Sequence, residues 1–142
     1  MKKVLIGGFF DLMHYAHVLT LKKAKAMGDY LVVFVASDEL AKKKKGDSRP
    51  IIPLAERMEI VRELRCVDEV VTLPGDHYEL AELLDMVKPD MVLLNVSEYS
   101  DLSKEEQYCK DRGVELVKIE RIVPESGLDT TKIIEKIKNS VI

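Results

Sequence analysis

Apolar and polar positions along the chain form two alternating patterns, short apolar runs and longer amphipathic segments. The short runs are rich in β-branched residues and bounded by turn residues, which is typical of strands covered on both faces. They predict strands within residues 3–8, 29–37, 67–73, 90–96 and 114–120. The segments between them repeat apolar residues at helical spacing and predict helices over residues 17–28, 54–66, 78–88, 102–113 and 128–141, with a short polar helix or turn over 38–46.

Glycines and prolines mark the expected helix boundaries. Gly28 and Gly113 follow amphipathic segments, and glycine commonly stands just after a helix. Pro53 suits the first turn of the helix expected over residues 54–66, and Pro89 prevents the helix over 78–88 from continuing.

The regular alternation of strands and helices predicts the fold class. We expect one α/β domain over residues 1–142, a Rossmann-like doubly wound sheet of about five parallel strands. Ligands of such sheets bind at the carboxyl ends of the strands, where the strand order reverses. The first expected strand ends at Gly7 and Gly8, so the residues that follow are expected in that crevice.

Composition and charge narrow the class of protein. The chain has 142 residues, 46% hydrophobic and 33% charged, with a net charge of −3, so the basic excess of a general nucleic-acid binder is absent. No apolar run approaches the ~18 residues of a membrane span, and the N-terminal run is too short and polar for a signal peptide. Two cysteines without metal-ligand spacing favour reduced thiols, and we expect a cytoplasmic protein that binds neither membrane nor nucleic acid.

Two of the three histidines, His14 and His17, stand three residues apart between the glycine pair and a helix. That spacing places both on one helix face near its N-terminus, which attracts phosphate. Imidazoles there can stabilise negative charge that develops on phosphoryl oxygens. Packed or solvated histidines and a metal site are the alternatives, the latter lacking a third ligand.

Three ordered blocks resemble one known family. Residues 7–17, GGFFDLMHYAH, resemble the G-T-F-D-x-x-H-x-G-H signature of the cytidylyltransferase-like nucleotidylyltransferases. Residues 43–70 resemble K-G-x-S-R-P, P-L-x-x-R-M and V-D elements of the heptose 1-phosphate adenylyltransferases of lipopolysaccharide core biosynthesis. Residues 127–137 resemble their G-x-S-T-T-x-I-I-x-K-I element.

The resemblance implies roles for particular residues. His14 and His17 would contact the triphosphate and stabilise the transition state, and Arg57 matches the Arg of the R-M element. One of three lysines would clamp phosphate, with Lys44 assigned the catalytic role and Lys42 and Lys45 assigned to nucleotide binding. The other residues implied in nucleotide binding are Gly8, Phe9, Phe10, Asp11, Arg121, Gly127, Thr130 and Thr131.

Some of these residues have simpler interpretations. Arg57, beside Glu56 and Glu59, is also consistent with a surface ion pair that contributes little to stability. Thr130 and Thr131 are consistent with a helix cap, and the lysine run with a solvated helix face. Asp11 would organise its loop or a metal-bound acceptor.

The chain also departs from the family pattern. Phe9 replaces Thr or Cys, Ala16 replaces the Gly between the histidines, and Asp129 replaces a Ser where it would cap the last helix. Residues 93–100, LLNVSEYS, replace a G-G-D or G-D-D element of the acceptor side, with Tyr99 expected at the rim of the crevice.

The reaction implied by the resemblance is transfer of AMP from ATP to a phosphate-bearing acceptor, with Mg²⁺ on the phosphates and release of pyrophosphate. A sugar phosphate is the favoured acceptor, with FMN adenylylation and CTP-dependent glycerol 3-phosphate cytidylylation as alternatives. A nucleotide-binding module without catalysis is the alternative of another class. The resemblance also implies a homodimer.

Overall fold

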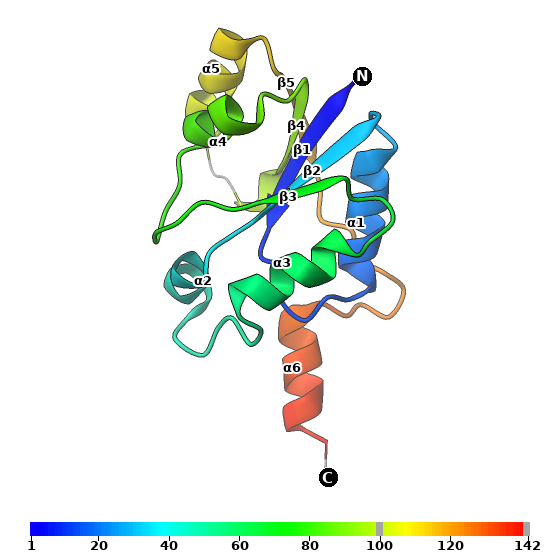
Figure 1. Ribbon diagram of the computed structural model, residues 1–142. Helices are drawn as coiled ribbons and strands as arrows, with labels where there is room; N and C mark the ends of the chain where they lie inside the picture. Colours follow the sequence, from blue (N-terminus) through cyan, green and yellow to red (C-terminus); the bar gives the residue numbers. More distant parts are fainter. Residues whose placement is uncertain (99–100, 141–142) are drawn as a thin grey trace.

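The computed structural model describes residues 1–98 and 101–140 of the chain (Figure 1). Its strands are β1 (Lys3–Gly8), β2 (Tyr30–Val35), β3 (Glu69–Val71), β4 (Met91–Asn95) and β5 (Glu115–Ile119). Its helices are α1 (Tyr15–Lys25), α2 (Asp38–Lys45), α3 (Leu54–Arg62), α4 (Leu80–Val87), α5 (Ser103–Arg112) and α6 (Thr130–Lys138), with one 3-10 turn, η1 (Val96–Glu98). The predicted alternation of strands and helices is confirmed.

All five described strands belong to one parallel sheet, in the order β3-β2-β1-β4-β5. The order reverses between β1 and β4, because successive strands are added on one side of β1 and then on the other. The carboxyl end of β1 therefore lies at the topological switch point, where such sheets leave a crevice. The predicted doubly wound fold is confirmed.

The two faces of the sheet are covered by different helices. One core cluster joins the sheet to α1 and α3, with Leu21, Ala24 and Val61 fully buried. The other joins it to α2, α4 and α5, with Leu40, Leu83 and Cys109 among its buried residues. Because both faces are covered, the central strands are apolar at nearly every position, as the sequence pattern indicated.

Helix ends differ from the sequence prediction in two places. The first helix ends at Lys25 instead of Gly28, and the one expected over residues 54–66 ends at Arg62. Gly28 instead lies close against the start of β1. A Cβ at this position would lie 2.6 Å from a Val4 methyl carbon and 2.8 Å from the Lys2 carbonyl oxygen. Gly113 does close α5, with a left-handed φ of 65°. Position 141 of the last expected helix lies outside the described residues.

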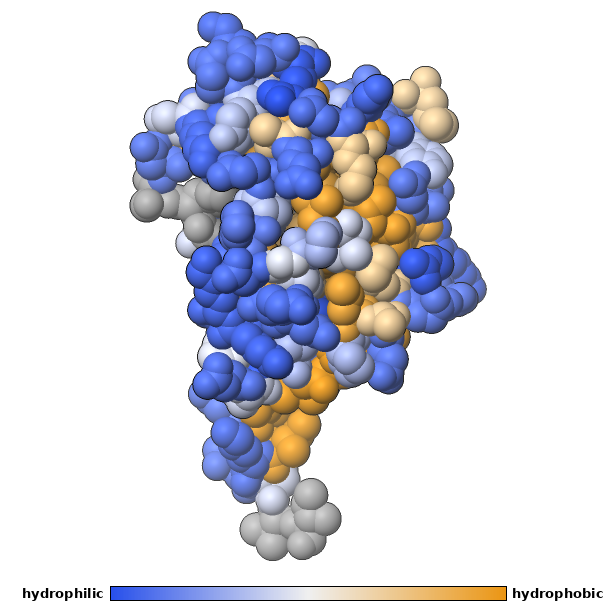
Figure 2. Space-filling model, turned by 60° about the vertical axis from the view of Figure 1, so that its left-hand side comes forward, coloured by the Kyte–Doolittle hydropathy of each residue, from blue (hydrophilic) through white to orange (hydrophobic). Residues whose placement is uncertain are grey.

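α6 stands apart from the layered body. It extends away from the end of the sheet where the chain leaves β1, and its C-terminal end is remote from the N-terminus (Figure 1). None of its residues is fully buried, and its apolar side continues onto the body as a hydrophobic stripe (Figure 2).

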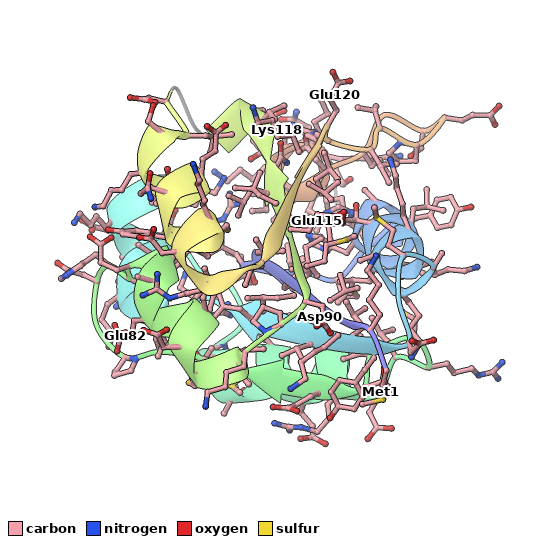
Figure 3. All side chains as sticks on the ribbon, turned by 90° about the horizontal axis from the view of Figure 1, so that it is seen from above. Met1, Glu82, Asp90, Glu115, Lys118 and Glu120 are labelled. Carbon is pink, nitrogen blue, oxygen red and sulfur yellow. The ribbon has the colours of Figure 1, made fainter. Side chains whose placement is uncertain are left out.

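The β5 edge of the sheet carries charged side chains. Glu115, Lys118 and Glu120 are exposed along this edge (Figure 3), while Leu116, Val117 and Ile119 pack against the two core clusters. Charges along an edge strand oppose pairing with the edge of another sheet. No helix among the described residues is long and apolar enough to cross a membrane.

Candidate active site

A cleft of about 430 Å³ opens at the carboxyl end of the sheet, beside the switch point. Its walls come from the loop after β1, the start of α1, the ends of β4 and β5, and the first turn of α6. Segments far apart in sequence therefore meet here. The sequence-predicted residues that line the cleft are Gly8, Phe9, Phe10, Asp11, His14, His17, Lys45, Arg121, Thr130 and Thr131.

The loop after β1 turns sharply so that its backbone faces the cleft. Phe10 and Leu12 adopt left-handed backbone conformations, with φ of 52° and 51°. Such conformations are strained for residues with a side chain, and burial of the Phe10 ring (5% exposed) holds the turn in place. A Cβ on Gly8 would lie 3.0 Å from that ring, so glycine suits the crowded start of the loop.

The two histidines stack on each other at the N-terminus of α1. Their ring centroids lie 3.8 Å apart, and the Phe10 ring meets His17 edge-on at 5.3 Å. The backbone N–H of His14 donates to Nδ1 of His17 over 3.3 Å. In neutral His17 the proton therefore sits on Nε2, which leaves that N–H as the donor of the ring.

Thr130 links the histidines to the last helix. Its hydroxyl donates to the Asp11 carbonyl oxygen over 3.0 Å, so it accepts from Nε2–H of His14, 3.2 Å away. One threonine thus fixes a histidine tautomer and ties the start of α6 to the loop after β1. The simpler interpretation of Thr130 as a helix cap is wrong, because Asp129 is the N-cap of α6 and the Thr130 hydroxyl bonds to Asp11 and His14 instead.

Both histidines are held in the neutral form. Burial lowers the pKa of His17 to about 4, with the neighbouring His14 as the next cause. Burial also lowers the pKa of His14, while the Asp129 carboxylate opposes that shift. At neutral pH both rings are therefore uncharged, and the Nε2–H of His17 is the ring donor left for phosphate, because that of His14 donates to Thr130.

Two helix N-termini open on the cleft. α1 begins at Tyr15 after His14, and α6 begins at Thr130 after Asp129. Free backbone N–H groups and the positive dipole end of each helix attract phosphate. The Asp129 carboxylate accepts from the Lys132 backbone N–H over 2.8 Å, which confirms it as the N-cap, and pairs with Arg121.

A buried pair of charges joins the loop after β1 to the loop before α3. The Asp11 carboxylate accepts the backbone N–H groups of Ile51 and Ile52 over 2.7 and 3.0 Å. The Arg57 guanidinium donates to the carbonyl oxygens of Phe9, Ala36 and Ile52 over 2.7–2.9 Å, and to the Asp38 carboxylate over 2.8 Å. We refer to Asp11 and Arg57 with these partners as the loop clamp.

The loop clamp corrects the interpretation of Arg57 as a surface ion pair, while its predicted catalytic role stays a prediction. Its side chain is fully buried (0% exposed), so it is not a surface ion pair with Glu56 or Glu59. It also does not line the cleft, so the structure places it behind the loop as a positioning residue. Asp11 likewise organises its loop, one of the two roles the resemblance left open.

The lysine run of α2 divides between two pockets. Lys45 lines the cleft, with its ammonium 5.7 Å from the Phe9 ring centroid, and Lys44 lines a smaller adjoining pocket. Lys42, about one helical turn before Lys45, lines neither pocket. The nucleotide-binding role predicted for Lys42 therefore lacks structural support.

Gly127 also lies away from both pockets. It closes the turn after Pro124, with a left-handed φ of 71° and its N–H bonded to the Pro124 carbonyl oxygen over 2.8 Å. Glycine is needed there for backbone conformation, which a sequence motif does not distinguish from ligand contact.

The cleft also contains residues to which sequence reasoning assigned no role. Arg49 and Pro50 line it from the loop before α3, and Asn95 and Ser97 line it after β4. Arg49 lies in the matched S-R-P element, so the motif itself was an available signal. Asn95 had none, because it replaces the family G-G-D element. Tyr99 and the end of that segment lie outside the described residues.

The donor set fits a magnesium ion that is held mainly by nucleotide phosphates. Within residues 1–98 and 101–140 there is no group of three or more His, Cys, Asp or Glu side chains that could hold a metal. The two aspartates at the cleft already accept backbone N–H groups. Mg²⁺ commonly retains water and binds through phosphates with few protein ligands.

Comparison with known families agrees with this geometry. The profile described as cytidylyltransferase-like matches residues 5–136. The chain belongs to the cytidylyltransferase-like family. It is an enzyme of the nucleotidyltransferase class, and the predicted resemblance is confirmed.

The chain is similar in sequence to two groups of curated proteins. The FAD synthase of Pyrococcus abyssi is 38% identical over 95% of this chain and 91% of that protein. The bifunctional protein HldE of Helicobacter pylori is 41% identical over 98% of this chain, which corresponds to 28% of that longer protein.

Solved structures share the fold. A lipopolysaccharide core biosynthesis protein of Thermoplasma volcanium superposes with a TM-score of 0.72 at 29% identity, over 86% of this chain and 98% of that one. A pantothenate synthetase of Thermus thermophilus superposes with a TM-score of 0.66 at 15% identity, over 94% of this chain and 61% of that one, which indicates a common fold alone.

Proposed function

We propose that this chain transfers AMP from ATP to the phosphate group of a small acceptor and releases pyrophosphate. The observation that carries the proposal is the stacked, neutral His14–His17 pair at a cleft on which two helix N-termini open. Such an arrangement suits a polyphosphate whose negative charge shifts during displacement.

The reaction needs no protein nucleophile. An acceptor phosphate oxygen attacks the α-phosphorus in line, the bond to the bridging oxygen of the β-phosphate breaks, and pyrophosphate takes the electron pair. The His17 Nε2–H and the α1 N-terminus stabilise the extra charge on the α-phosphate oxygens, with His14 stacked on His17 and holding its position. Thr131, Arg121 and the α6 N-terminus hold the outer phosphates, and Mg²⁺ bound with ATP would neutralise part of their charge.

The names of the relatives define two candidate acceptors. The match to HldE and the family motifs favour a sugar phosphate, and the match to FAD synthases over nearly their full length favours FMN. A phosphate monoester is common to both. The cleft offers Lys45 and Arg49 as cationic partners for it.

We also propose that the protein is a homodimer in which the apolar side of α6 contacts a second copy. α6 has only nine residues and none is fully buried, whereas isolated helices shorter than about 12 residues are marginal in water. Ile137 of this helix is 57% exposed, and the protruding part of the molecule carries a hydrophobic stripe in Figure 2. A second copy would cover this stripe, while the charged β5 edge opposes sheet pairing.

The test is pyrophosphate release from purified protein with Mg²⁺. ATP and CTP are each combined with heptose 1-phosphate, FMN and glycerol 3-phosphate. We expect turnover with ATP and one acceptor, and a loss of about 100-fold or more in kcat for His17→Ala. His77→Ala is the matched control, since that histidine is exposed and distant from the cleft. ATP binding with no pyrophosphate release from any combination would support a non-catalytic nucleotide-binding module instead.

A further inference from the structure

A second, smaller pocket adjoins the cleft on the opposite side of the loop after β1. It has a volume of about 100 Å³ and is lined chiefly by Phe9, Phe34, Leu40, Lys44, Tyr78 and Leu94. We refer to it as the annex. It shares Gly7, Gly8 and Asn95 with the cleft, so the two spaces are adjacent.

The annex extends onto the sheet face opposite the histidines, where Phe34, Leu40 and Leu94 line it. Phe9 packs against the core under α2 and α4, whereas its neighbour Phe10 is buried in the core under α1. Lys44 of α2 lines the annex, and its neighbour Lys45 lines the cleft. A ligand that spans both spaces would thus pass over Gly8, with one cation available on each side.

In-line displacement assigns the two spaces to different substrates. In the proposed function the outer phosphates lie at the start of α6, so pyrophosphate leaves in that direction. The attacking oxygen must approach the α-phosphorus from the opposite side, which is the side of Gly8 and the annex. The annex is therefore placed to receive the organic part of the acceptor.

The walls of the annex are apolar and aromatic. The Phe34 ring is buried, and its centroid lies 4.7 Å from that of Tyr78. Few polar side chains line it: the Thr20 hydroxyl donates to the Ala16 carbonyl oxygen and Asn95 Oδ1 accepts both Ser97 donors, which leaves the Lys44 ammonium and the Asn95 amide N–H groups as donors. A polyol chain in this space would lose hydrogen bonds to water without replacing most of them, which opposes its binding.

We infer that the annex binds a flat apolar ring of the acceptor, so that the substrate is a phosphate monoester of an aromatic compound rather than of a polyhydroxylated sugar. The inference rests on the proposed function for the position of the acceptor. An apolar cavity of comparable size accommodates a single six-membered ring, so one edge of a larger ring system would enter while the remainder lies over Phe9.

The test measures binding without turnover, by calorimetry in the absence of ATP. The probes are FMN, riboflavin as the same ring without phosphate, and heptose 1-phosphate. We expect FMN to bind at least tenfold more tightly than heptose 1-phosphate, with riboflavin binding measurably on its own. Tyr78→Ala should weaken FMN and riboflavin about tenfold, and Tyr108→Ala, a tyrosine of α5 outside the annex, should not.

A second pair of variants separates the phosphate from the ring. Lys45→Met should weaken FMN several-fold and leave riboflavin unchanged, whereas Lys43→Met, on the same helix and outside both pockets, should alter neither. Tighter binding of heptose 1-phosphate than of FMN, or a Tyr78→Ala variant that weakens ATP alone, would overturn the inference. FMN binding that responds to Tyr78 without any pyrophosphate release would refute the proposed reaction and leave the annex assignment intact.

Discussion

The uncharged state of the histidine pair follows from its surroundings. His17 lies under the loop after β1 and against a second imidazole, so a proton on it would lose hydration and meet a like charge when His14 is also protonated. A bound triphosphate would reverse this balance, because its negative charge favours the protonated rings. The pair is thus suited to respond to the charge of the ligand.

The first prediction concerns pH and stability. The pKa of His17 is about 4 in the folded protein, below its ordinary value of 6.5. Above pH 6.5 the His17 ring is neutral in both the folded and the unfolded protein. Below pH 6.5 the unfolded protein takes up the proton first, so the free energy of unfolding falls until about pH 4. The difference between pKa values of 6.5 and about 4 corresponds to a loss of unfolding free energy on the order of 3 kcal/mol.

Urea unfolding of wild type and His17→Gln at pH 7.5 and 5.0 checks this prediction. The wild-type protein should lose more unfolding free energy between the two pH values than the variant, which lacks the titrating ring. Equal losses in both proteins would show that other groups cause the acid sensitivity.

The second prediction concerns Asp129, which replaces a serine of the family pattern. Its carboxylate caps α6 and pairs with Arg121, which also lines the cleft. Phosphate must therefore compete with Asp129 for Arg121. Asp129→Ser keeps a capping oxygen but releases the guanidinium, so stability should change by less than about 1 kcal/mol.

We expect the Asp129→Ser variant to bind ATP several-fold more tightly, with little change in its thermal midpoint. Asp129→Ala serves as the control, because it releases Arg121 and also removes the cap. Calorimetric titration with ATP and Mg²⁺ measures the difference. Weaker ATP binding by the serine variant would mean that Asp129 holds Arg121 in its binding position instead of competing for it.

At the scale of elements, the loop clamp determines the shape of the cleft. Arg57 of α3 is the donor to carbonyl groups at the ends of β1 and β2, and Asp11 is the acceptor for the loop between α2 and α3. The loop before α3 thus supplies the N–H donors that the Asp11 carboxylate accepts, and the loop after β1 supplies a carbonyl acceptor for Arg57. The two loops that line the cleft are positioned relative to each other by buried hydrogen bonds.

The third prediction is that Arg57→Met destabilises the protein by about 3 kcal/mol or more, because buried carbonyl oxygens and the Asp38 carboxylate lose their donor. Arg62→Met, at the exposed end of the same helix, should cost less than about 1 kcal/mol. Urea unfolding measures both variants.

The activity of the same variants tests the positioning role. If the variant remains folded at low temperature, its kcat should fall more than its KM for ATP rises, because the loop after β1 shifts while the α6 N-terminus does not. Arg57→Lys should recover part of the stability and little of kcat, since one ammonium cannot reach all four partners. Full activity in Arg57→Met would refute the positioning role.

At the scale of the whole molecule, α6 is the element least explained by its own contacts. Its N-terminal turn is held by Thr130 and Asp129, and Ile137 in its last turn is exposed to solvent. A helix with this arrangement suits a contact with a second copy of the protein. Such a contact would also hold in place the N-terminus of α6, which faces the cleft.

The fourth prediction is that wild-type protein sediments as a dimer and Ile137→Glu as a monomer. A glutamate there would place a charge in the apolar contact, where it has no partner. Ile60→Glu on α3, also at an exposed isoleucine, should remain dimeric. A wild-type monomer at micromolar concentration would contradict the proposal.

Local sequence pattern was sufficient for the architecture. Buried parallel strands have short apolar runs in the sequence, and the helices that cover them repeat apolar residues about every 3.6 positions. The alternation of strands and helices and the position of Gly8 at the switch point were therefore predictable. His14, His17 and Thr130 were predictable as well, because the family blocks match at those positions. Their roles in catalysis and binding remain predictions.

Only the tertiary structure decided which polar groups meet. Arg57 and Arg62 stand on one helix among glutamates, yet one is fully buried and the other is half exposed, because only Arg57 faces the ends of β1 and β2. Its bond to Phe9 spans 48 residues, and the bond between His14 and Thr130 spans 116. Periodicity along a chain specifies which face of an element is apolar, but contacts between distant segments depend on strand order and on the turns that set it.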